Sequence, residues 1–124
     1  MSREKKPYSI EDLDRCIVLC FCDILGKKWT YPILFKLEPD REYSFTEILS
    51  LGKRRINRTL LSVILRDLIM LDILEKNRKK YRLTNRGIKI KNLLTSLKAV
   101  ILEDREKYLE KWREECEIIK FFGK

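Results

Sequence analysis

Histidine and glutamine are absent from this chain, and alanine occurs only once, at Ala99. The absence of histidine removes the commonest general base of enzymes and a frequent zinc ligand. The sequence also lacks a glycine-rich phosphate loop and a Gly-x-Ser-x-Gly nucleophile turn. We therefore predict that the chain is not an enzyme and has neither a catalytic residue nor a cofactor.

Glycine and proline are scarce, with four and three among 124 residues, so loops should be few and short, as in a mainly helical protein. This length suits one hydrophobic core, and we expect a single domain over residues 1–124. No apolar run reaches the roughly twenty residues of a membrane span. The polar tail 1–8, expected to be flexible, does not resemble a signal peptide. These features predict a cytoplasmic protein without a membrane partner.

Positive charge is concentrated in the middle of the sequence. Residues 51–91 hold thirteen Lys/Arg and three acids, a net charge of +10, whereas the rest of the chain holds fifteen Lys/Arg and sixteen acids, a net charge of −1. A basic segment in an otherwise neutral chain is typical of a surface that meets a polyanion. The charge-rich, glutamine-free composition also fits a thermophilic source or an AT-rich genome.

The first forty residues predict two helices. Ser9 can cap the first helix, with Asp12 three residues later, and Gly26 would end it. Apolar residues at helical spacing would form its buried face: Leu13, Ile17, Cys20, Phe21, Ile24 and Leu25. A second apolar helix should begin near Lys28, with Pro32 in its first turn.

Two further helices show clear start signals. Ser44 and Glu47 form an S-x-x-E capping box for a short helix that ends near Gly52. Asn57 caps the next helix, which the apolar spacing predicts over about 57–71. A short helix, a tight turn and a second capped helix are typical of a helix-turn-helix.

The rest of the chain completes this arrangement. Two short strands around a basic tip predict a β-hairpin over 73–84, and a helical tail follows with a bend near 103–104. The fold class predicted is mainly α with a small β-hairpin wing: a winged helix-turn-helix core over 9–87, extended by N- and C-terminal dimerisation helices.

The basic residues gather on the two elements that a winged helix presents to duplex DNA. The N-terminal part of the second helix would read base edges in the major groove, where Arg58 can bond guanine. The preceding turn would contact phosphates, and the wing would lie along the backbone or in the minor groove. The predicted DNA-binding residues are Lys53, Arg54, Arg55, Asn57, Arg58, Thr59, Ser62, Arg66, Arg78, Lys79, Lys80 and Arg82. The competing interpretation is a basic face that is only solvated.

Short motifs along residues 16–87 follow a known order. They are Cys16, GKKWT at 26–30, ILFKL at 33–37, FTEI at 45–48, IN, LS and LRDL within 56–68, and YRLTNRG at 81–87. In this order and spacing they resemble the HxlR-type winged-helix regulators, which are related to the MarR group. The resemblance implies a winged helix-turn-helix transcriptional regulator that binds double-stranded DNA.

Some positions depart from the family pattern. The family usually has proline where this chain has Ile17, and glycine at the end of the recognition helix where it has Asp72. The wing is short, and the last thirty or so residues carry no family motif. These differences leave the fold and DNA binding as expected but leave any small-molecule or redox effector undefined.

Four cysteines allow several interpretations. Cys16, Cys20 and Cys22 lie close together, with Cys116 far along the chain. Without histidine a zinc site is disfavoured, and we predict no metal. Buried, inert thiols are the plain interpretation. The alternatives are a redox role for Cys16, which matches a reactive thiol of some HxlR-type regulators and lies beside Arg15, and a disulfide of Cys116.

The tail carries apolar residues mostly three or four positions apart: Leu94, Leu97, Ile101, Tyr108, Trp112, Cys116 and Ile119. Such a stripe must be covered, either by the chain's own core or by a twofold partner. A partner would place two recognition helices one DNA turn apart, roughly 34 Å. We predict a homodimer built from the N-terminal helix and the C-terminal helices over 88–124.

The predicted function is therefore sequence-specific binding of double-stranded DNA in transcription regulation. The recognition helix would lie in the major groove and the wing at 73–84 on the backbone or in the minor groove. The alternative is a winged-helix adaptor in the transcription machinery, whose basic face would meet acidic protein or RNA.

Overall fold

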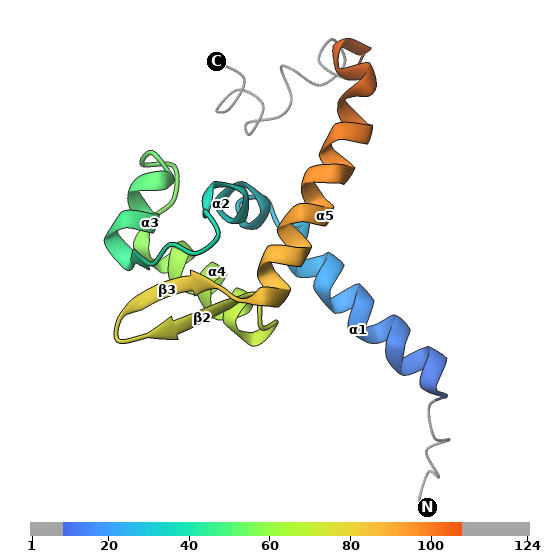
Figure 1. Cartoon of the computed structure of the whole chain (residues 1–124), viewed down its shortest axis with the longest axis horizontal. Coiled ribbons are helices and arrows are strands. Elements are labelled where there is room, and N and C mark those ends of the chain that lie inside the picture. The colour runs from blue at the N-terminus through green and yellow to red at the C-terminus, as the bar shows by residue number, and fades with distance from the viewer. Residues whose placement is uncertain (1–8, 108–124) are drawn as a thin grey trace, which may run out of the picture.

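The computed structural model describes residues 9–107 and contains the helices and the wing in the predicted order (Figure 1). The elements are α1 (Ile10–Leu25), α2 (Thr30–Lys36), β1 (Tyr43–Ser44), α3 (Phe45–Leu51), α4 (Arg58–Met70), β2 (Leu74–Asn77), β3 (Lys80–Leu83), α5 (Asn85–Ile101) and the 3-10 turn η1 (Leu102–Asp104). The expected flexible tail 1–8 and the end of the expected dimerisation helices, 108–124, lie outside the described residues. Within 9–107, no helix is both long and apolar enough to cross a bilayer.

Side-chain caps begin the helices where the sequence predicts them. Ser9 and Asn57 each accept a hydrogen bond from the backbone N–H three residues on, at 3.1 and 2.7 Å. At α3 the Ser44 hydroxyl accepts from the Glu47 N–H (3.1 Å), while the Glu47 carboxylate accepts from the Ser44 N–H (2.9 Å). The predicted capping box is thus complete, and it satisfies backbone donors that the first helical turn would otherwise leave without a partner.

The sheet has one strand more than the sequence predicts. Its three antiparallel strands lie in the order β1-β3-β2, and β1 joins through the pairing of Tyr43 with Tyr81. In the hairpin, Asn77 and Lys80 pair across β2 and β3 and leave only two residues, Arg78 and Lys79, at the tip. Lys80 therefore belongs to β3 and not to the loop.

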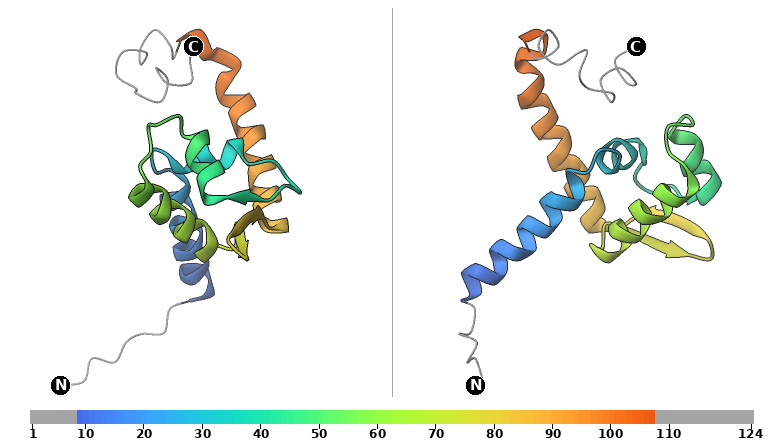
Figure 2. Two further views of the ribbon diagram at one scale, coloured as in Figure 1. Left: turned by 90° about the vertical axis from the view of Figure 1, so that its left-hand side faces the viewer. Right: turned by 180° about the vertical axis from the view of Figure 1, so that it is seen from behind.

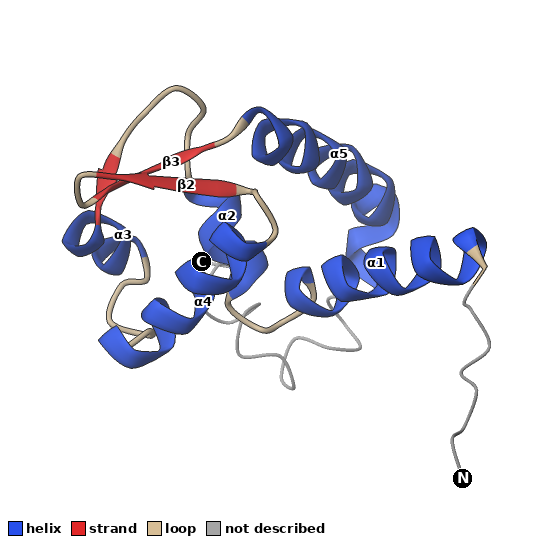
Figure 3. Cartoon of the chain, turned by 90° about the horizontal axis from the view of Figure 1, so that it is seen from below, coloured by secondary structure: helices blue, strands red, loops and turns tan. Residues whose placement is uncertain are grey.

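The hydrophobic core lies between the sheet and α2, α3 and α4. Its most deeply buried side chains, with at most 2% of their surface exposed, come from all of these elements: Ile33, Leu34, Leu37, Ile48, Leu61, Leu65, Leu68, Ile73 and Leu74. In Figure 3 the sheet lies along one side of these helices, and α1 and α5 lie at the end opposite α3. The apolar stripe of α4 faces this core, so its polar side faces solvent.

The expected buried face of α1 is wrong over most of its length. Ile24 is buried and Phe21 and Leu25 pack against the core, but Leu13 and Ile17 are 49% and 57% exposed. Cys20 is exposed as well. The reason is geometric, since α1 leads away from the body and only its last turns reach the rest of the described chain (Figure 2). The helical spacing identified an apolar face, but residues 9–107 leave most of it exposed.

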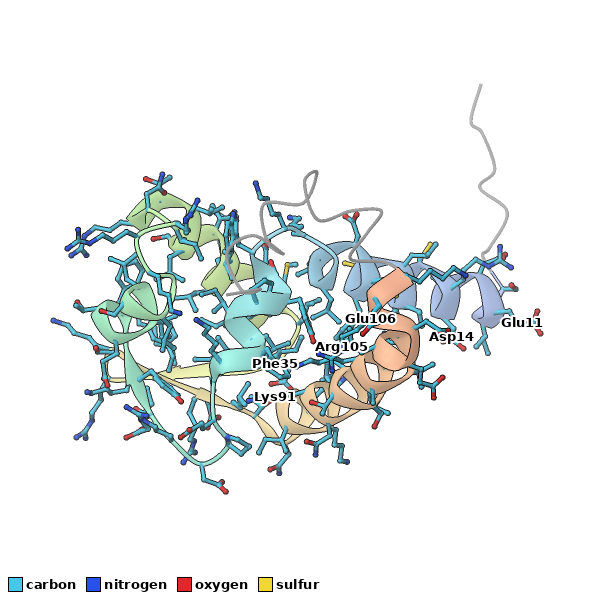
Figure 4. The ribbon with its side chains drawn as sticks, turned by 90° about the horizontal axis from the view of Figure 1, so that it is seen from above. Glu11, Asp14, Phe35, Lys91, Arg105 and Glu106 are labelled. Atoms are coloured by element: carbon cyan, nitrogen blue, oxygen red, sulfur yellow. The ribbon has the colours of Figure 1, made fainter. Side chains whose placement is uncertain are left out.

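Two lysines hold α5 against α2, Lys91 in its first half and Lys98 in its last turn. The Lys91 ammonium donates to the carbonyl of Leu37, and the Lys98 ammonium lies 4.0 Å from the centre of the Phe35 ring. Figure 4 shows Lys91 and Phe35 pointing toward one another from α5 and α2. The helix α5 ends at Ile101, three residues after Lys98, and η1 begins at Leu102. The break agrees with the bend predicted near 103–104.

Candidate nucleic-acid interface

The helix-turn-helix gives α4 a buried side and a polar side. Leu61, Ile64, Leu65 and Leu68 are buried in the core. The side chains predicted to bind DNA from this helix are all exposed: Arg58, Thr59, Ser62 and Arg66. Because buried and exposed positions alternate with helical spacing, the exposed ones share one face. That face is free of acidic residues, since Asp67 lies toward the other side and pairs with Lys27 at 3.3 Å.

The turn before α4 has an unusual backbone. Lys53 and Arg54 both have positive φ angles, 49° and 67°, and the Arg55 N–H donates to the Gly52 carbonyl at 2.9 Å. Positive φ is unfavourable for residues with a Cβ atom and is normally left to glycine or asparagine. The chain nevertheless has two basic residues there, and their side chains are exposed.

The wing tip repeats this arrangement. Arg78 and Lys79 have φ angles of 49° and 67°, between the paired residues Asn77 and Lys80. Two positive φ angles in a two-residue hairpin loop are typical of a type I′ turn, for which Asn-Gly is the preferred sequence. Two separate turns on the basic segment thus hold cationic residues in a conformation that other residues adopt more easily.

A groove of about 330 Å³ separates α4 from the wing. It is lined by Ser62 and Arg66 of α4, by Phe45 of α3 and by Lys76 and Tyr81 of the wing, among others. The Lys76 ammonium lies 5.5 Å from the centre of the Tyr81 ring. Lys76 is a residue that the sequence reasoning missed. Strand alternation could have identified it, because in the antiparallel register residue 76 shares a sheet face with its partner Tyr81.

Lys80 and Arg82 lie on the other face of the wing. Tyr81 and Leu83 are buried while Lys80 and Arg82 are exposed, as alternation along a strand requires. Both Nε and Nη2 of Arg82 donate to the Glu75 carboxylate, at 3.1 and 2.7 Å, and this bond raises the pKa of Arg82. Lys80 lies 3.9 Å from Glu47. The structure thus separates these two predicted residues from the polar face of α4 and gives each an acidic neighbour.

Helix α4 passes into the wing through a fixed junction. The Asp72 N–H donates to the Ile69 carbonyl and the Ile73 N–H to the Leu68 carbonyl, both at 2.9 Å, which is the Schellman pattern. Asp72 has a φ of 58°, which explains why glycine would suit this position. The three residues between α4 and β2, 71–73, thus all donate backbone hydrogen bonds to the last turns of α4, which holds the helix and the strand together.

Thr84 links the base of the wing to the first turn of α5. Its hydroxyl donates to backbone carbonyls of residues 72 and 73 and accepts from the Gly87 N–H at 2.9 Å, so it also caps α5. A Cβ atom at Gly87 would lie only 2.1 Å from the Ile73 carbonyl oxygen. The glycine is therefore required by the close approach of α5 to the base of the wing.

The cysteines of α1 are exposed. Cys16, Cys20 and Cys22 are accessible free thiols, so the interpretation of buried, inert thiols is wrong for them. Cys116 lies outside the described residues. Within the part of the chain that the structure describes, no group of three or more His, Cys, Asp or Glu side chains is arranged to hold a metal ion.

Known structures share this fold. The chain is similar to the crystal structure of quinone-bound YodB from B. subtilis, with a TM-score of 0.60 and 22% identity over 75% of this chain and 98% of that one. It is also similar to NolR from Sinorhizobium fredii, with a TM-score of 0.54 and 18% identity over 75% and 96%. No protein-family model and no curated protein matches the sequence. The predicted class, a mainly helical winged helix-turn-helix with a small antiparallel sheet, is confirmed.

Proposed function

We propose that this protein is a transcriptional regulator that binds double-stranded DNA in a sequence-specific manner and does so without enzymatic activity. The observation that carries the proposal is the acid-free, exposed face of α4 between two exposed basic turns. In winged helices these are the elements that meet the major groove and the neighbouring backbone. The resemblance to HxlR-type regulators along residues 16–87 supports the same function.

The residues would divide into three roles. Arg58, Thr59, Ser62 and Arg66 would face the major groove, with Arg58 also lying 5.7 Å from the Phe45 ring, which limits its freedom before binding. The turn residues Lys53, Arg54 and Arg55, and the Asn57 cap, would approach phosphates of one strand. Arg78 and Lys79 would reach the backbone or minor groove beyond the wing. Lys80 and Arg82 would contribute least, because each has an acidic neighbour.

A homodimer fits the exposed apolar surface of the outer helices. On α1 large apolar side chains stand in water: Ile10, Leu13, Ile17, Val18 and Leu19 are 49% to 78% exposed. Three of them, Ile10, Leu13 and Ile17, share one side of the helix by their spacing, and an exposed apolar side of this kind marks an interaction site. Pairing of two chains through α1 and the C-terminal helices over 88–124, of which α5 also exposes Leu93 and Leu97, would cover this surface and present two copies of α4 to successive turns of one DNA face.

The test of DNA binding is a salt titration on random and promoter duplexes. About six phosphate contacts per chain should make log K fall with log salt at a slope of roughly −5. Tighter binding to selected promoter fragments would establish sequence preference. If no duplex is bound at low salt, the proposal fails and the adaptor role, with acidic protein or RNA on the same face, takes its place.

Two substitutions test the roles assigned to α4 and the wing. Arg58→Ala should weaken binding and also relax the choice between sequences, because a base contact is lost. Lys79→Ala should weaken binding to every duplex alike and make the salt slope shallower by about 1. Equal effects of both variants on all sequences would contradict this division.

The dimer is tested by the solution mass of Ile17→Glu, with Arg15→Glu as a control on the same helix. A charge at the apolar position should dissociate the dimer, since it would be buried without a partner. The control, at a polar exposed position, should not. A monomeric mass of the unaltered protein at working concentration would exclude the dimer.

Cys16 is the candidate redox residue. It is exposed on α1, and YodB, which shares the fold, was crystallised with quinone bound. We propose that oxidation or alkylation at Cys16 alters the apolar α1 surface and thereby DNA affinity. A variant that keeps Cys16 as the one α1 thiol tests this, and unchanged DNA affinity after complete alkylation would exclude it.

A further inference from the structure

A groove with a volume of about 580 Å³ lies where the end of α1 and the start of α2 meet the C-terminal half of α5; we call it the α5 groove. One wall is a stripe of aliphatic residues at helical spacing: Leu94, Leu97, Ile101 and Leu102. The facing wall includes Leu25, Tyr31 and Pro32. The volume is in the range of small-molecule sites. The described lining residues include none of those predicted to bind DNA.

The two walls differ in how firmly they are packed. On α2, Pro32 is buried, and the Tyr31 ring lies against the Phe35 ring with 5.9 Å between their centres. Partial burial raises the pKa of Tyr31, so this wall keeps some water away from its side chain. On the α5 wall, Leu97 and Ile101 are 52% and 50% exposed. The groove is therefore already formed and open, and an apolar ligand can enter it without a change of fold.

The charge that the described residues bring to the groove is positive. Lys27, Lys28 and Lys98 are among its lining residues, and none of the described lining residues is acidic. Lys27 pairs with Asp67 at 3.3 Å. The Lys98 ammonium lies 4.0 Å from the centre of the Phe35 ring, and a ring face attracts an ammonium without neutralising its charge. Lys98 therefore places a positive charge beside the aliphatic stripe.

The shape and charge of the groove define the chemistry of its ligand. The stripe from Leu94 to Leu102 is about 12 Å long at the helical rise of 1.5 Å per residue, so it fits a linear aliphatic tail. A nucleotide or a sugar would leave most of its polar groups without a partner on these walls. An anionic group at one end of the tail would form a charge-assisted hydrogen bond with the Lys98 ammonium. A carboxylate with an aliphatic tail meets both conditions.

We propose that the α5 groove binds a medium-chain fatty carboxylate, whose tail lies along the stripe from Leu94 to Leu102 and whose carboxylate pairs with Lys98. One molecule binds per chain, held between α5 on one side and the end of α1 and the start of α2 on the other. The described lining residues are separate from the predicted DNA interface. The inference therefore goes beyond the proposed function and does not depend on DNA binding.

The test is isothermal titration calorimetry of the full-length protein with sodium decanoate, below the concentration at which decanoate forms micelles. We expect saturable binding of one decanoate per chain. Octanoate, which is two methylenes shorter, should bind about tenfold more weakly, because each methylene removed from water contributes up to about fourfold in affinity. Absence of decanoate binding, or uptake of many molecules without saturation, would overturn the proposal.

A ligand with the same tail and the opposite charge tests the carboxylate. Decyltrimethylammonium should bind at least about tenfold more weakly than decanoate, because it would bring a positive charge to Lys98. Equal affinities would mean that the groove only adsorbs apolar chains, and would overturn the assignment of a carboxylate.

Variants of Lys98 test the ion pair. Lys98→Met removes the charge and should lower the affinity for decanoate at least about fivefold, whereas Lys98→Arg keeps the charge and should retain binding. Lys89→Met is the matched control, since Lys89 is exposed on the same helix outside the groove. Equal losses in the two methionine variants would contradict the proposed ion pair.

A further pair of variants tests the position of the tail. Leu97→Gln places a polar group in the stripe and should lower the affinity for decanoate at least about fivefold. Leu93→Gln, at a 69% exposed position of the same helix outside the groove, should leave the affinity unchanged. Circular dichroism and the solution mass verify that both variants fold and assemble like the unaltered protein. An unchanged affinity in Leu97→Gln would contradict the proposed position of the tail.

Discussion

The region from α2 to β3 buries its large apolar side chains, whereas the two outer helices, α1 and α5, leave many of theirs exposed. In the first, Leu34, Ile48 and Leu68 have no exposed surface, whereas on α1 and α5 Ile10 and Leu93 are 78% and 69% exposed. The first region also has complete caps and a fixed helix-to-strand junction. Among the described residues, the winged helix therefore covers its own apolar side chains, whereas the outer helices leave theirs exposed, as the proposed dimer requires.

The largest expected loss of stability comes from a substitution where α5 meets the base of the wing. Gly87→Ala would place a Cβ atom 2.1 Å from the Ile73 carbonyl oxygen, so α5 and the base of the wing must separate. We expect a loss of about 4 kcal/mol in the free energy of unfolding, measured by urea titration. Gly52→Ala is the control, because its Cβ would come no closer than 3.1 Å to the Ile56 side chain, which needs to move by only a few tenths of an ångström. Similar losses in both variants would refute this account.

Truncation of apolar side chains compares the two regions directly. Leu68→Ala removes a side chain with no exposed surface and should cost about 3 kcal/mol. Ile10→Ala, at a 78% exposed position, should change the stability of the monomer by less than about 0.5 kcal/mol. Both are measured by denaturant unfolding at low protein concentration. A large loss in Ile10→Ala would mean that α1 is already covered under those conditions.

The wing tip is the part of the compact region that is not optimised for stability. Arg78→Asn with Lys79→Gly supplies the residues that a type I′ turn prefers and should stabilise the protein by about 1 kcal/mol. The same change removes two cations per chain, so the salt slope of DNA binding should become shallower by about 2 per chain. Thermal unfolding and a salt titration measure the two effects. A loss of stability would contradict the positive φ angles of Arg78 and Lys79. An unchanged salt slope would contradict the proposed role of the wing tip in DNA binding.

The smallest expected effect concerns the capping box. The bond from the Ser44 backbone N–H, with help from Lys80 and Arg41, lowers the pKa of Glu47 below its ordinary 4.5. The ionised carboxylate therefore stabilises the fold above pH 4.5, and this contribution is lost as the pH falls through the lowered pKa. The stability difference between the unaltered protein and Glu47→Ala should be small at pH 7 and vanish at acidic pH. A difference that does not depend on pH would exclude the ionic contribution.

Local signals predicted most of the compact region. Caps act within three residues, so Ser9, the Ser44–Glu47 box and Asn57 could be recognised from the sequence and are found in the structure. The strand β1 could not, because two residues become a strand only through the distant partner Tyr81. Local information is sufficient where a helix end satisfies its own backbone and insufficient where pairing comes from elsewhere in the chain.

The outer helices and the candidate site were harder to predict. The periodicity of α1 identifies an apolar face but does not say what covers it, so burial was expected at Leu13 and Ile17 and is not observed. In the wing the basic residues were treated as one group. The register divides them, with Lys76 facing α4 and Arg82 bonded to Glu75 on the other side. Charge along a sequence predicts a basic segment, but only strand register assigns each charge to a face.

The junction at Thr84 has a mechanical consequence. One hydroxyl joins the end of α4, the base of the wing and the first turn of α5. A shift of α5, whether imposed by a second chain or by an effector, cannot be absorbed at a loose hinge there. It would turn the wing and α4 together, so in the proposed dimer a shift of the outer helices would change the distance between the two copies of α4.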